Sequence, residues 1–240
     1  MTSNKRKDGS TALFIGVSRS GKSIPLKKAS EQNKRCISID PKGEMHTQLG
    51  FEKFEDKELF LNRLIEVGDG DAQLVFVTNS KKDFDFFCDA AFNFNRVKEC
   101  AIAVEELALY TNSASAQGHW GRLINQGLAY GVLILATVQR GQEVDKTLMN
   151  NATFLHITKH NTLSDRLYIA SKLDIDVDEI PVDALKFLQW TSDKGVVTKG
   201  VIAFDKTKKG NWKNGAPIFT CGGEVRQVLP NGQFKGVEYH

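Results

Sequence analysis

The 240-residue sequence has no long hydrophobic run. A helix that spans a bilayer needs about 18 or more apolar residues in succession, and no stretch of the chain approaches that length. The first seven residues, Met-Thr-Ser-Asn-Lys-Arg-Lys, lack the apolar segment of a secretory signal peptide. We therefore expect a protein that is not secreted and has no intrinsic membrane span.

Cysteine is scarce, and neither sign of charge is in large excess. The four cysteines show neither C-x-x-C nor Cys/His metal spacing, which argues against a zinc site and favours reduced, buried thiols in a cytosolic setting. A net charge of +3 is too small to establish a nucleic-acid partner, because such a partner depends on local clustering of charge. With 41% hydrophobic residues, the composition is that of a globular domain.

What the sequence does contain is a complete phosphate-loop motif, G-x-x-x-x-G-K-S, directly after an apolar run. Its residues are Gly16, Val17, Ser18, Arg19, Ser20, Gly21, Lys22 and Ser23. The two glycines let the backbone curl so that successive N–H groups face a phosphate. We expect Lys22 to reach the β- and γ-phosphates and the Ser23 hydroxyl to bind Mg²⁺. The alternative is an ordinary Gly-rich turn between a strand and a helix.

Apolar strand-like segments alternate along the chain with segments of helical periodicity. Strands are expected at 11–15, 35–39, 73–78, 100–104, 131–137, 153–157 and 200–204, and helices up to about 33 and at 57–67, 83–94, 120–130 and 163–173. This alternation predicts an α/β fold, with a mostly parallel central sheet flanked by helices. We assign 1–205 to this domain, including a flexible leader at 1–10. The basic, Gly- and Asn-rich residues 206–240 are expected to form a short C-terminal extension.

Polar residues stand just past the ends of four expected strands: the phosphate loop, Asp40, Glu105 and Gln139. Ligands of parallel sheets bind beyond the carboxyl ends of the strands, so these residues are expected to converge on one site.

Glu105 and Glu106 have the placement of a Walker B element, since they follow a strand that is apolar throughout. We predict that Glu105 orders the Mg²⁺ shell with Ser23 and that Glu106 polarises the attacking water. The first position is usually Asp, which leaves the division of labour between the glutamates open. The alternative is a solvated acidic pair that opens a helix. Gln139 is either a ligand of the γ-phosphate and the lytic water or a plain strand-end glutamine.

The motifs of this chain, and the order in which they follow one another, resemble those of the HerA/FtsK superfamily of DNA-pumping ATPases. The resemblance covers roughly residues 11 to 190 and rests on the phosphate loop and on the segments 39–44, 104–106, 125–132, 136–140 and 151–152. A chain of this length, with no accessory DNA-binding domain or membrane anchor, is similar to the genome-packaging ATPases of membrane-containing, tailless icosahedral viruses and phages.

That resemblance implies a RecA-like core with ATP and Mg²⁺ as cofactors. It also implies a homo-oligomer, a hexameric ring with ATP sites shared between subunits. The implied partners are double-stranded DNA and the proteins of a capsid vertex, and the implied location is the host cytoplasm or the virion.

One departure from the superfamily concerns the arginine that acts across the subunit interface. The superfamily commonly has Gly-Arg where this chain has Gly127-Leu128. Arg122 and Arg140 are the remaining candidates for this catalytic role, and each is equally interpretable as a surface or carboxylate-paired arginine.

The leading hypothesis is a motor that uses ATP hydrolysis to move double-stranded viral DNA into a capsid. Its DNA contacts are less evident, because Lys42, Lys81, Lys82 and the lysines at 206, 208 and 209 each have solvated surface as the simpler interpretation. One alternative is an assembly ATPase of the filamentous-phage type, which works at a membrane. Another is a nucleotide-dependent switch or kinase that moves no DNA, although no N/T-K-x-D guanine-recognition sequence is present.

Overall fold

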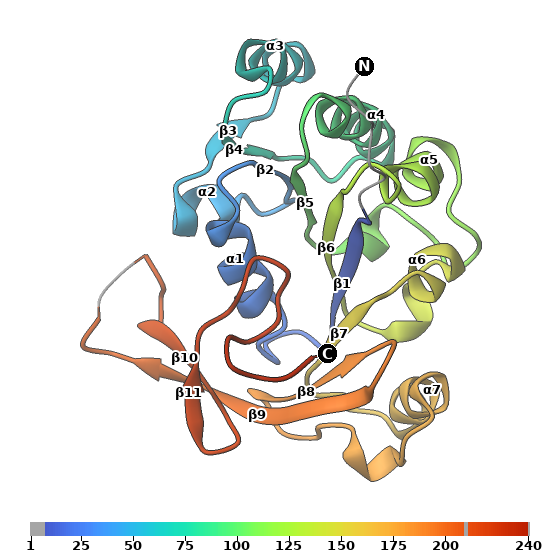
Figure 1. Ribbon diagram of the computed structural model, residues 1–240, viewed down its shortest axis with the longest axis vertical. Coiled ribbons are helices and arrows are strands. Elements are labelled where there is room, and N and C mark those ends of the chain that lie inside the picture. The colour runs from blue at the N-terminus through green and yellow to red at the C-terminus, as the bar shows by residue number, and fades with distance from the viewer. Residues whose placement is uncertain (1–7, 209–210, 240) are drawn as a thin grey trace.

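The computed structural model describes residues 8–208 and 211–239, so residues 1–7 of the expected leader and Lys209 lie outside the described residues. Figure 1 shows a central sheet with helices packed on it. The strands are β1 (Ser10–Ile15), β2 (Cys36–Ile39), β3 (Glu52–Phe54), β4 (Gln73–Phe76), β5 (Ala101–Val104), β6 (Leu133–Val138), β7 (Phe154–Ile157), β8 (Lys186–Thr191), β9 (Gly195–Asp205), β10 (Ala216–Cys221) and β11 (Glu224–Arg226). The α-helices are α1 (Ser23–Gln32), α2 (Glu44–Leu49), α3 (Lys57–Val67), α4 (Lys81–Val97), α5 (Gly118–Gly127), α6 (Lys146–Asn150) and α7 (Leu163–Leu173).

All of these strands belong to one sheet, in the order β11-β10-β9-β8-β7-β1-β6-β5-β2-β4-β3. From β7 to β3 every neighbouring pair is parallel, and from β7 to β11 every pair is antiparallel. The predicted α/β fold, with a mostly parallel central sheet flanked by helices, is confirmed. The antiparallel continuation at one end was not predicted.

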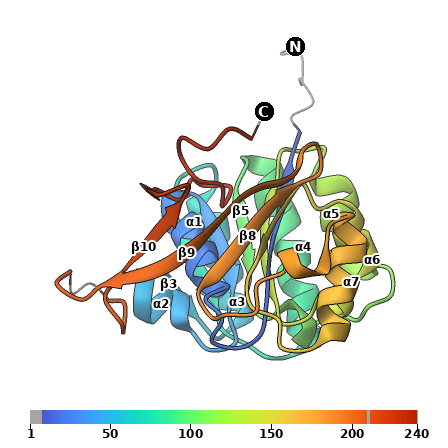
Figure 2. The same ribbon diagram turned by 90° about the horizontal axis from the view of Figure 1, so that it is seen from below.

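Both faces of the sheet are covered, which explains why the central strands are apolar throughout. Successive side chains of β1 alternate between two cores, with Leu13 and Ile15 in one and Ala12 and Phe14 in the other. Helices α3 to α7 supply residues to the first core. Helices α1 and α2 pack on the opposite face, as the rotated view makes clear (Figure 2).

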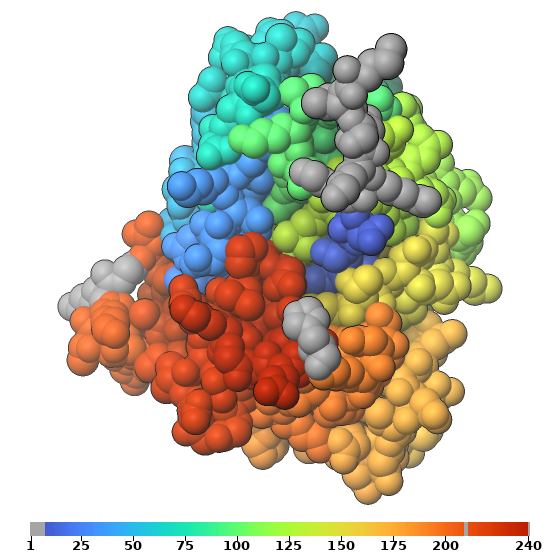
Figure 3. All heavy atoms as spheres, in the orientation of Figure 1, coloured from blue at the N-terminus to red at the C-terminus, as the bar shows by residue number. Residues whose placement is uncertain are grey.

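The second core also receives side chains from the last part of the chain. Val228, Phe234 and Tyr239 are buried there, and the Tyr239 hydroxyl donates a hydrogen bond to Gln189 on β8. On the face shown in Figure 3, the C-terminal segment (red) lies against the strands in orange. The domain boundary after residue 205 stays a prediction, and the fold adds that β10 continues the sheet by pairing with β9.

The position of β1 determines where the phosphate loop lies. This strand is central, between β6 and β7, and its last residue, Ile15, is in register with Val138 of β6. The ends of β5 and β2 are aligned beside β6 in the same direction. The phosphate loop, Asp40, Glu105 and Gln139 therefore lie at one edge of the sheet. Within the described ranges, none of the helices is both long and apolar enough to cross a bilayer.

Candidate nucleotide site

The phosphate loop joins β1 to α1 and packs closely on the residue after β7. Gly16 has φ of +155°, and a Cβ atom there would lie 2.0 Å from Thr158 Oγ1. That oxygen lies 2.6 Å from Ser20 Oγ, and the Val17 N–H donates to Lys159 O over 3.0 Å. Glycine is the residue that this close approach permits, so the packing of the loop itself accounts for the first glycine of the motif.

The rest of the loop presents hydrogen-bond donors without internal partners. Within the described ranges, the backbone N–H groups of Arg19, Gly21, Lys22 and Ser23 meet no protein acceptor. Backbone N–H groups require a partner when they are taken out of water, and several N–H groups that open a helix form a ready site for a phosphate. The loop is therefore built to receive an anion.

Lys22 adds a buried positive charge to these donors. Only 7% of its surface is exposed, and no ion pair to its ammonium is found in the part of the chain that the structure describes. Burial lowers the pKa of Lys22, although the nearby charges of Glu105 and Glu106 act in the opposite direction. A charge held in this way costs free energy until a counter-charge arrives, which a phosphate group would provide.

Glu105 joins the phosphate loop to the end of β5. Its Oε2 atom accepts hydrogen bonds from Ser23 Oγ at 3.1 Å and from Thr137 Oγ1 at 2.7 Å. Its Oε1 atom is buried and has no hydrogen-bond partner among the described residues. Burial raises the pKa of Glu105, and the charge of Lys27 partly offsets this effect.

These oxygens fit Mg²⁺, which prefers carboxylate, hydroxyl and phosphate oxygens as ligands. The two residues predicted to hold the metal, Ser23 and Glu105, lie in direct contact. The unpartnered Oε1 of Glu105 is the atom that a cation would satisfy.

Because its carboxylate is buried, Glu105 should make the protein less stable without nucleotide. A raised pKa means that this carboxyl favours folding at low pH, and that this contribution is lost as pH rises through the folded-state pKa. Glu105→Gln is therefore expected to increase the free energy of unfolding by about 0.5–2 kcal/mol at pH 8, with a smaller gain at pH 5. Thermal unfolding at both pH values measures this, with the exposed Glu66→Gln as control. A lower melting temperature for Glu105→Gln at pH 8 would contradict it.

Glu106 has an unusual backbone conformation and a cationic partner. It lies in the left-handed region with φ of 54° and ψ of 51°, and its N–H donates to Thr137 Oγ1 over 2.8 Å. Its carboxylate forms an ion pair with Lys42 of the β2–α2 turn. A strained backbone that is held by surrounding contacts is common at functional sites.

Sequence reasoning missed Thr137 as part of this site. The side chain is fully buried on β6, and its single hydroxyl oxygen contacts both glutamates, donating to the Glu105 carboxylate and accepting from the Glu106 N–H. A lone hydroxyl within the most apolar strand of the sequence was the available signal, because a buried hydroxyl needs hydrogen-bond partners.

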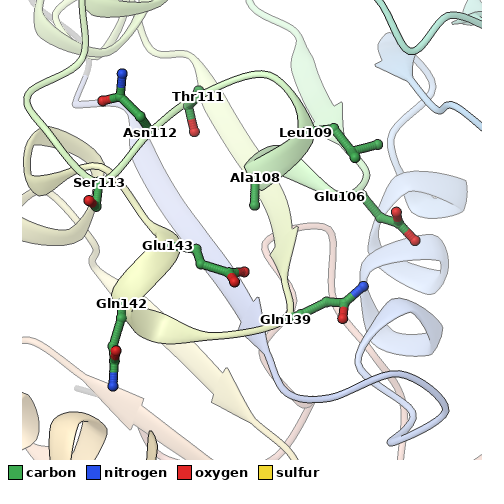
Figure 4. Close-up of a pocket in the computed structure, with 9 residues that line it drawn as sticks. All are labelled: Glu106, Ala108, Leu109, Thr111, Asn112, Ser113, Gln139, Gln142 and Glu143. Atoms are coloured by element: carbon green, nitrogen blue, oxygen red, sulfur yellow. The ribbon is translucent and has the colours of Figure 1, made fainter.

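Gln139 shares a cavity of about 410 Å³ with Glu106. Figure 4 shows their side chains at one end of this cavity, with Gln142 and Asn112 farther along it. The cavity lies past the ends of β5 and β6, and the end of β6 is in register with the end of β1, which the phosphate loop follows. The structure thus places Gln139 and Glu106 at the edge where the phosphate loop begins.

Arg122 and Arg140 both pair with carboxylates of their own chain. Arg122, on α5, lies 3.2 Å from Asp89 and over the ring of Phe92. Arg140 directly follows Gln139 and contacts Asp165 Oδ1 through Nη2 at 2.8 Å and through Nε at 2.9 Å. The hydrogen bond that Arg140 donates to the Asp165 carboxylate raises the pKa of Arg140. An action across a subunit interface stays a prediction for both arginines.

If one of these arginines completes the neighbour's site, its replacement by alanine should reduce turnover about a thousand-fold without weakening nucleotide binding. Such a finger acts on charge that develops in the transition state. Mixing the arginine variant with a Lys22→Ala subunit should restore part of the activity, because some interfaces then combine an intact loop with an intact arginine. Arg140→Lys, which keeps a cation beside the buried Asp165, controls for folding. Mixed rings without recovered activity would contradict the hypothesis.

Comparisons with known proteins agree with this geometry. The chain has 14% sequence identity to the genome packaging NTPase B204 from Sulfolobus turreted icosahedral virus 2, solved in complex with AMPPCP, with a TM-score of 0.59 over 78% of this chain and 94% of B204. This chain has the B204 fold. B204 has also been solved with ATP-gammaS, so the neighbour with this fold binds ATP analogues. The predicted resemblance to viral genome-packaging ATPases is confirmed.

Two further comparisons are informative. The pCW3 conjugation coupling protein TcpA, in its monomer form with ATPgS, matches 79% of this chain and 59% of its own with a TM-score of 0.51 and 15% identity. Over 105 residues the chain is 31% identical to Protein P9 of Pseudoalteromonas phage PM2, a stretch that covers 43% of this chain and 48% of P9. The match thus spans about half the length of that curated relative. No protein-family model matches the chain.

Proposed function

We propose that this chain is an ATPase that moves double-stranded viral DNA into a capsid. It would act as a homo-oligomeric ring, expected to be a hexamer, at a capsid vertex, in the host cytoplasm, the virion or both. Three observations support the proposal: the B204 fold, the open phosphate loop and the pair of glutamates at the end of β5.

The observation that carries the proposal is the 3.1 Å contact between Ser23 and Glu105. It joins the phosphate loop to the acidic strand end, although 82 residues separate them in sequence. Phosphoryl transfer needs positioning and charge stabilisation more than covalent chemistry. This contact brings the phosphate-binding loop and a carboxylate that can hold a metal ion to one place.

Each residue then has a role in hydrolysis. The loop N–H groups and Lys22 bind the β- and γ-phosphates and offset their charge. Ser23 and Glu105 would hold Mg²⁺, which neutralises phosphate charge when bound. Glu106 accepts a proton from the attacking water, and Gln139 orients that water beside the γ-phosphate. Arg122 or Arg140 would act on the neighbouring subunit's site.

The test is ATP hydrolysis with and without double-stranded DNA at two salt concentrations, using Lys22→Ala protein as the blank. We expect DNA to stimulate hydrolysis at about 50 mM salt and to lose most of this effect by about 200 mM, because phosphate contacts release counterions. A rate of ATP hydrolysis that DNA does not change at either salt concentration would favour a nucleotide-dependent switch. An absence of hydrolysis would refute the ATPase itself.

A further inference from the structure

The second half of the phosphate loop is held by a residue from the antiparallel part of the sheet. Leu185 comes directly before β8, and its N–H donates a hydrogen bond to Ser20 O over 3.0 Å. The carbonyl oxygen of Leu185 in turn accepts a hydrogen bond from the N–H of Ile202, on β9, over 2.8 Å. The backbone of Leu185 therefore connects β9 to the phosphate loop.

Leu185 makes this connection in a conformation that leucine rarely adopts. Its φ is 66°, which lies in the left-handed region, where a large side chain is uncommon. Such a conformation persists only where the surrounding structure fixes it, and it is concentrated at functional sites. The fold thus holds Leu185 in an unfavourable conformation at the point where its N–H meets the phosphate loop.

The contact with Leu185 sets the direction of the next N–H group in the loop. A trans peptide unit is planar, so its C=O and N–H groups point in opposite directions. Because the C=O of Ser20 is directed at Leu185, the N–H of Gly21 points to the other side. This N–H meets no acceptor among the described residues. It is therefore one of the donors that remain available to a phosphate.

Gly21 cannot fix the orientation of this peptide unit by itself. Its φ is +101°, and glycine has more backbone freedom than any other residue. Rotation of the peptide unit would replace the N–H that faces the phosphates by a carbonyl oxygen, which repels them. A Cβ atom on Gly21 would lie 3.1 Å from Ile202 Cδ1 and 3.2 Å from Leu185 Cδ2. The antiparallel strands therefore pack on this side of the loop, and the hydrogen bond from Leu185 selects one orientation of the peptide.

We propose that Leu185 is a positioning residue for nucleotide binding, which holds the Ser20–Gly21 peptide with its N–H toward the phosphates and its carbonyl away from them. This inference rests on the proposed function, because it assigns a further residue to the same ATP site. It also gives the antiparallel strands a task in that site, since β9 supplies the hydrogen bond that holds Leu185 in place.

The test measures the affinity of the full chain for ATP-gammaS with Mg²⁺ in the wild type, Leu185→Ile and Leu185→Met. Both variants keep a large apolar side chain, but only isoleucine is β-branched, and a β-branched residue strongly opposes the left-handed conformation. Leu185→Ile should bind about ten-fold or more weakly, which corresponds to the loss of one hydrogen bond to a charged group. Leu185→Met should bind within about two-fold of the wild type, because the exchange conserves volume.

Asp174→Ile is the matched control. Asp174 also has a positive φ, 53°, but it is exposed at the end of α7, where its N–H donates to Ala170 O. Asp174→Ile should lower the melting temperature, as Leu185→Ile does, because both place a β-branched residue in the left-handed region. The affinity of Asp174→Ile for ATP-gammaS should equal that of the wild type. A purely structural role for Leu185 predicts the same behaviour for both isoleucine variants.

Thermal unfolding without nucleotide establishes that each variant is folded at the temperature of the binding measurement. If a folded Leu185→Ile binds ATP-gammaS as tightly as the wild type, the positioning role is wrong. The role is also wrong if Leu185→Met or Asp174→Ile loses as much affinity as Leu185→Ile, because the backbone conformation of Leu185 is then not the cause. A wild type that binds no ATP-gammaS would instead refute the proposed function.

Discussion

Lys22→Ala is expected to reduce ATP hydrolysis by at least about a thousand-fold, the upper range for loss of one charge-stabilising donor. The Lys22 side chain is buried and forms no ion pair with another described residue, so the fold does not depend on its charge. Its loss removes the cation that would face the β- and γ-phosphates. Steady-state release of phosphate measures the effect.

The burial of the unpaired Lys22 ammonium also predicts the stability of the variant. Burying an unpaired ammonium costs free energy, so Lys22→Ala should melt no lower than the wild type when no nucleotide is present. Lys34, which is exposed and lies past the C-terminal end of α1, provides the control, and Lys34→Ala should retain activity. If a folded Lys22→Ala protein hydrolyses ATP at an unchanged rate, the assignment of residues 16–23 as a phosphate loop is wrong.

Glu106→Gln is expected to slow hydrolysis by about a hundred-fold or more, which is the scale for loss of a general base. The amide keeps the shape of the side chain but cannot accept a proton from water. Binding of nucleotide should be preserved, because the hydroxyls of Ser23 and Thr137 donate to the Glu105 carboxylate, and Glu106 contacts Thr137 only through its backbone N–H, which the substitution keeps. Single-turnover hydrolysis and binding of an ATP analogue separate the two effects.

The adjacent glutamate provides the decisive comparison. Glu105→Gln should weaken the dependence of hydrolysis on Mg²⁺ concentration, since Glu105 contacts the hydroxyl of Ser23. Should Glu105→Gln show the loss of a general base while Glu106→Gln stays active, the two roles that we assigned are reversed.

The parallel half of the fold was predictable from the sequence, because its strands are buried on both faces and therefore appear as short apolar runs. The expected strand at 153–157 corresponds to β7, and the expected helices at 57–67 and 163–173 coincide with α3 and α7. The helix expected at 120–130 ends earlier, since α5 closes at Gly127 before a turn.

The antiparallel half could not be predicted in the same way. Most side chains of β9 are half-buried or exposed. Only its second half, residues 200–204, has an apolar run, so a strand was expected at 200–204 although β9 begins at Gly195. The short β3 and α2 were also missed. Their few residues give too little periodicity, and tertiary packing decides their conformation.

The candidate site also has one part that was predictable from the sequence and one part that was not. Motif spacing identified the phosphate loop, Glu105, Glu106 and Gln139, because these lie at strand ends. Their partners were not identified from the sequence. Thr137 and Thr158 contribute through single hydroxyl groups, and the pairing of Lys42 with Glu106 joins residues 64 positions apart. Such contacts depend on strand order, which a single sequence does not specify.

The central position of β1 has a consequence for biosynthesis. The first strand of the chain completes its pairing only with β6 and β7, more than 100 residues later in sequence, and the phosphate loop packs on Thr158. Long-range pairing of this kind slows folding and leaves apolar strands exposed on the ribosome. A nascent chain that ends before Thr158 therefore carries the complete phosphate-loop motif but lacks the surface that shapes it, so the proposed nucleotide site is completed only late in translation.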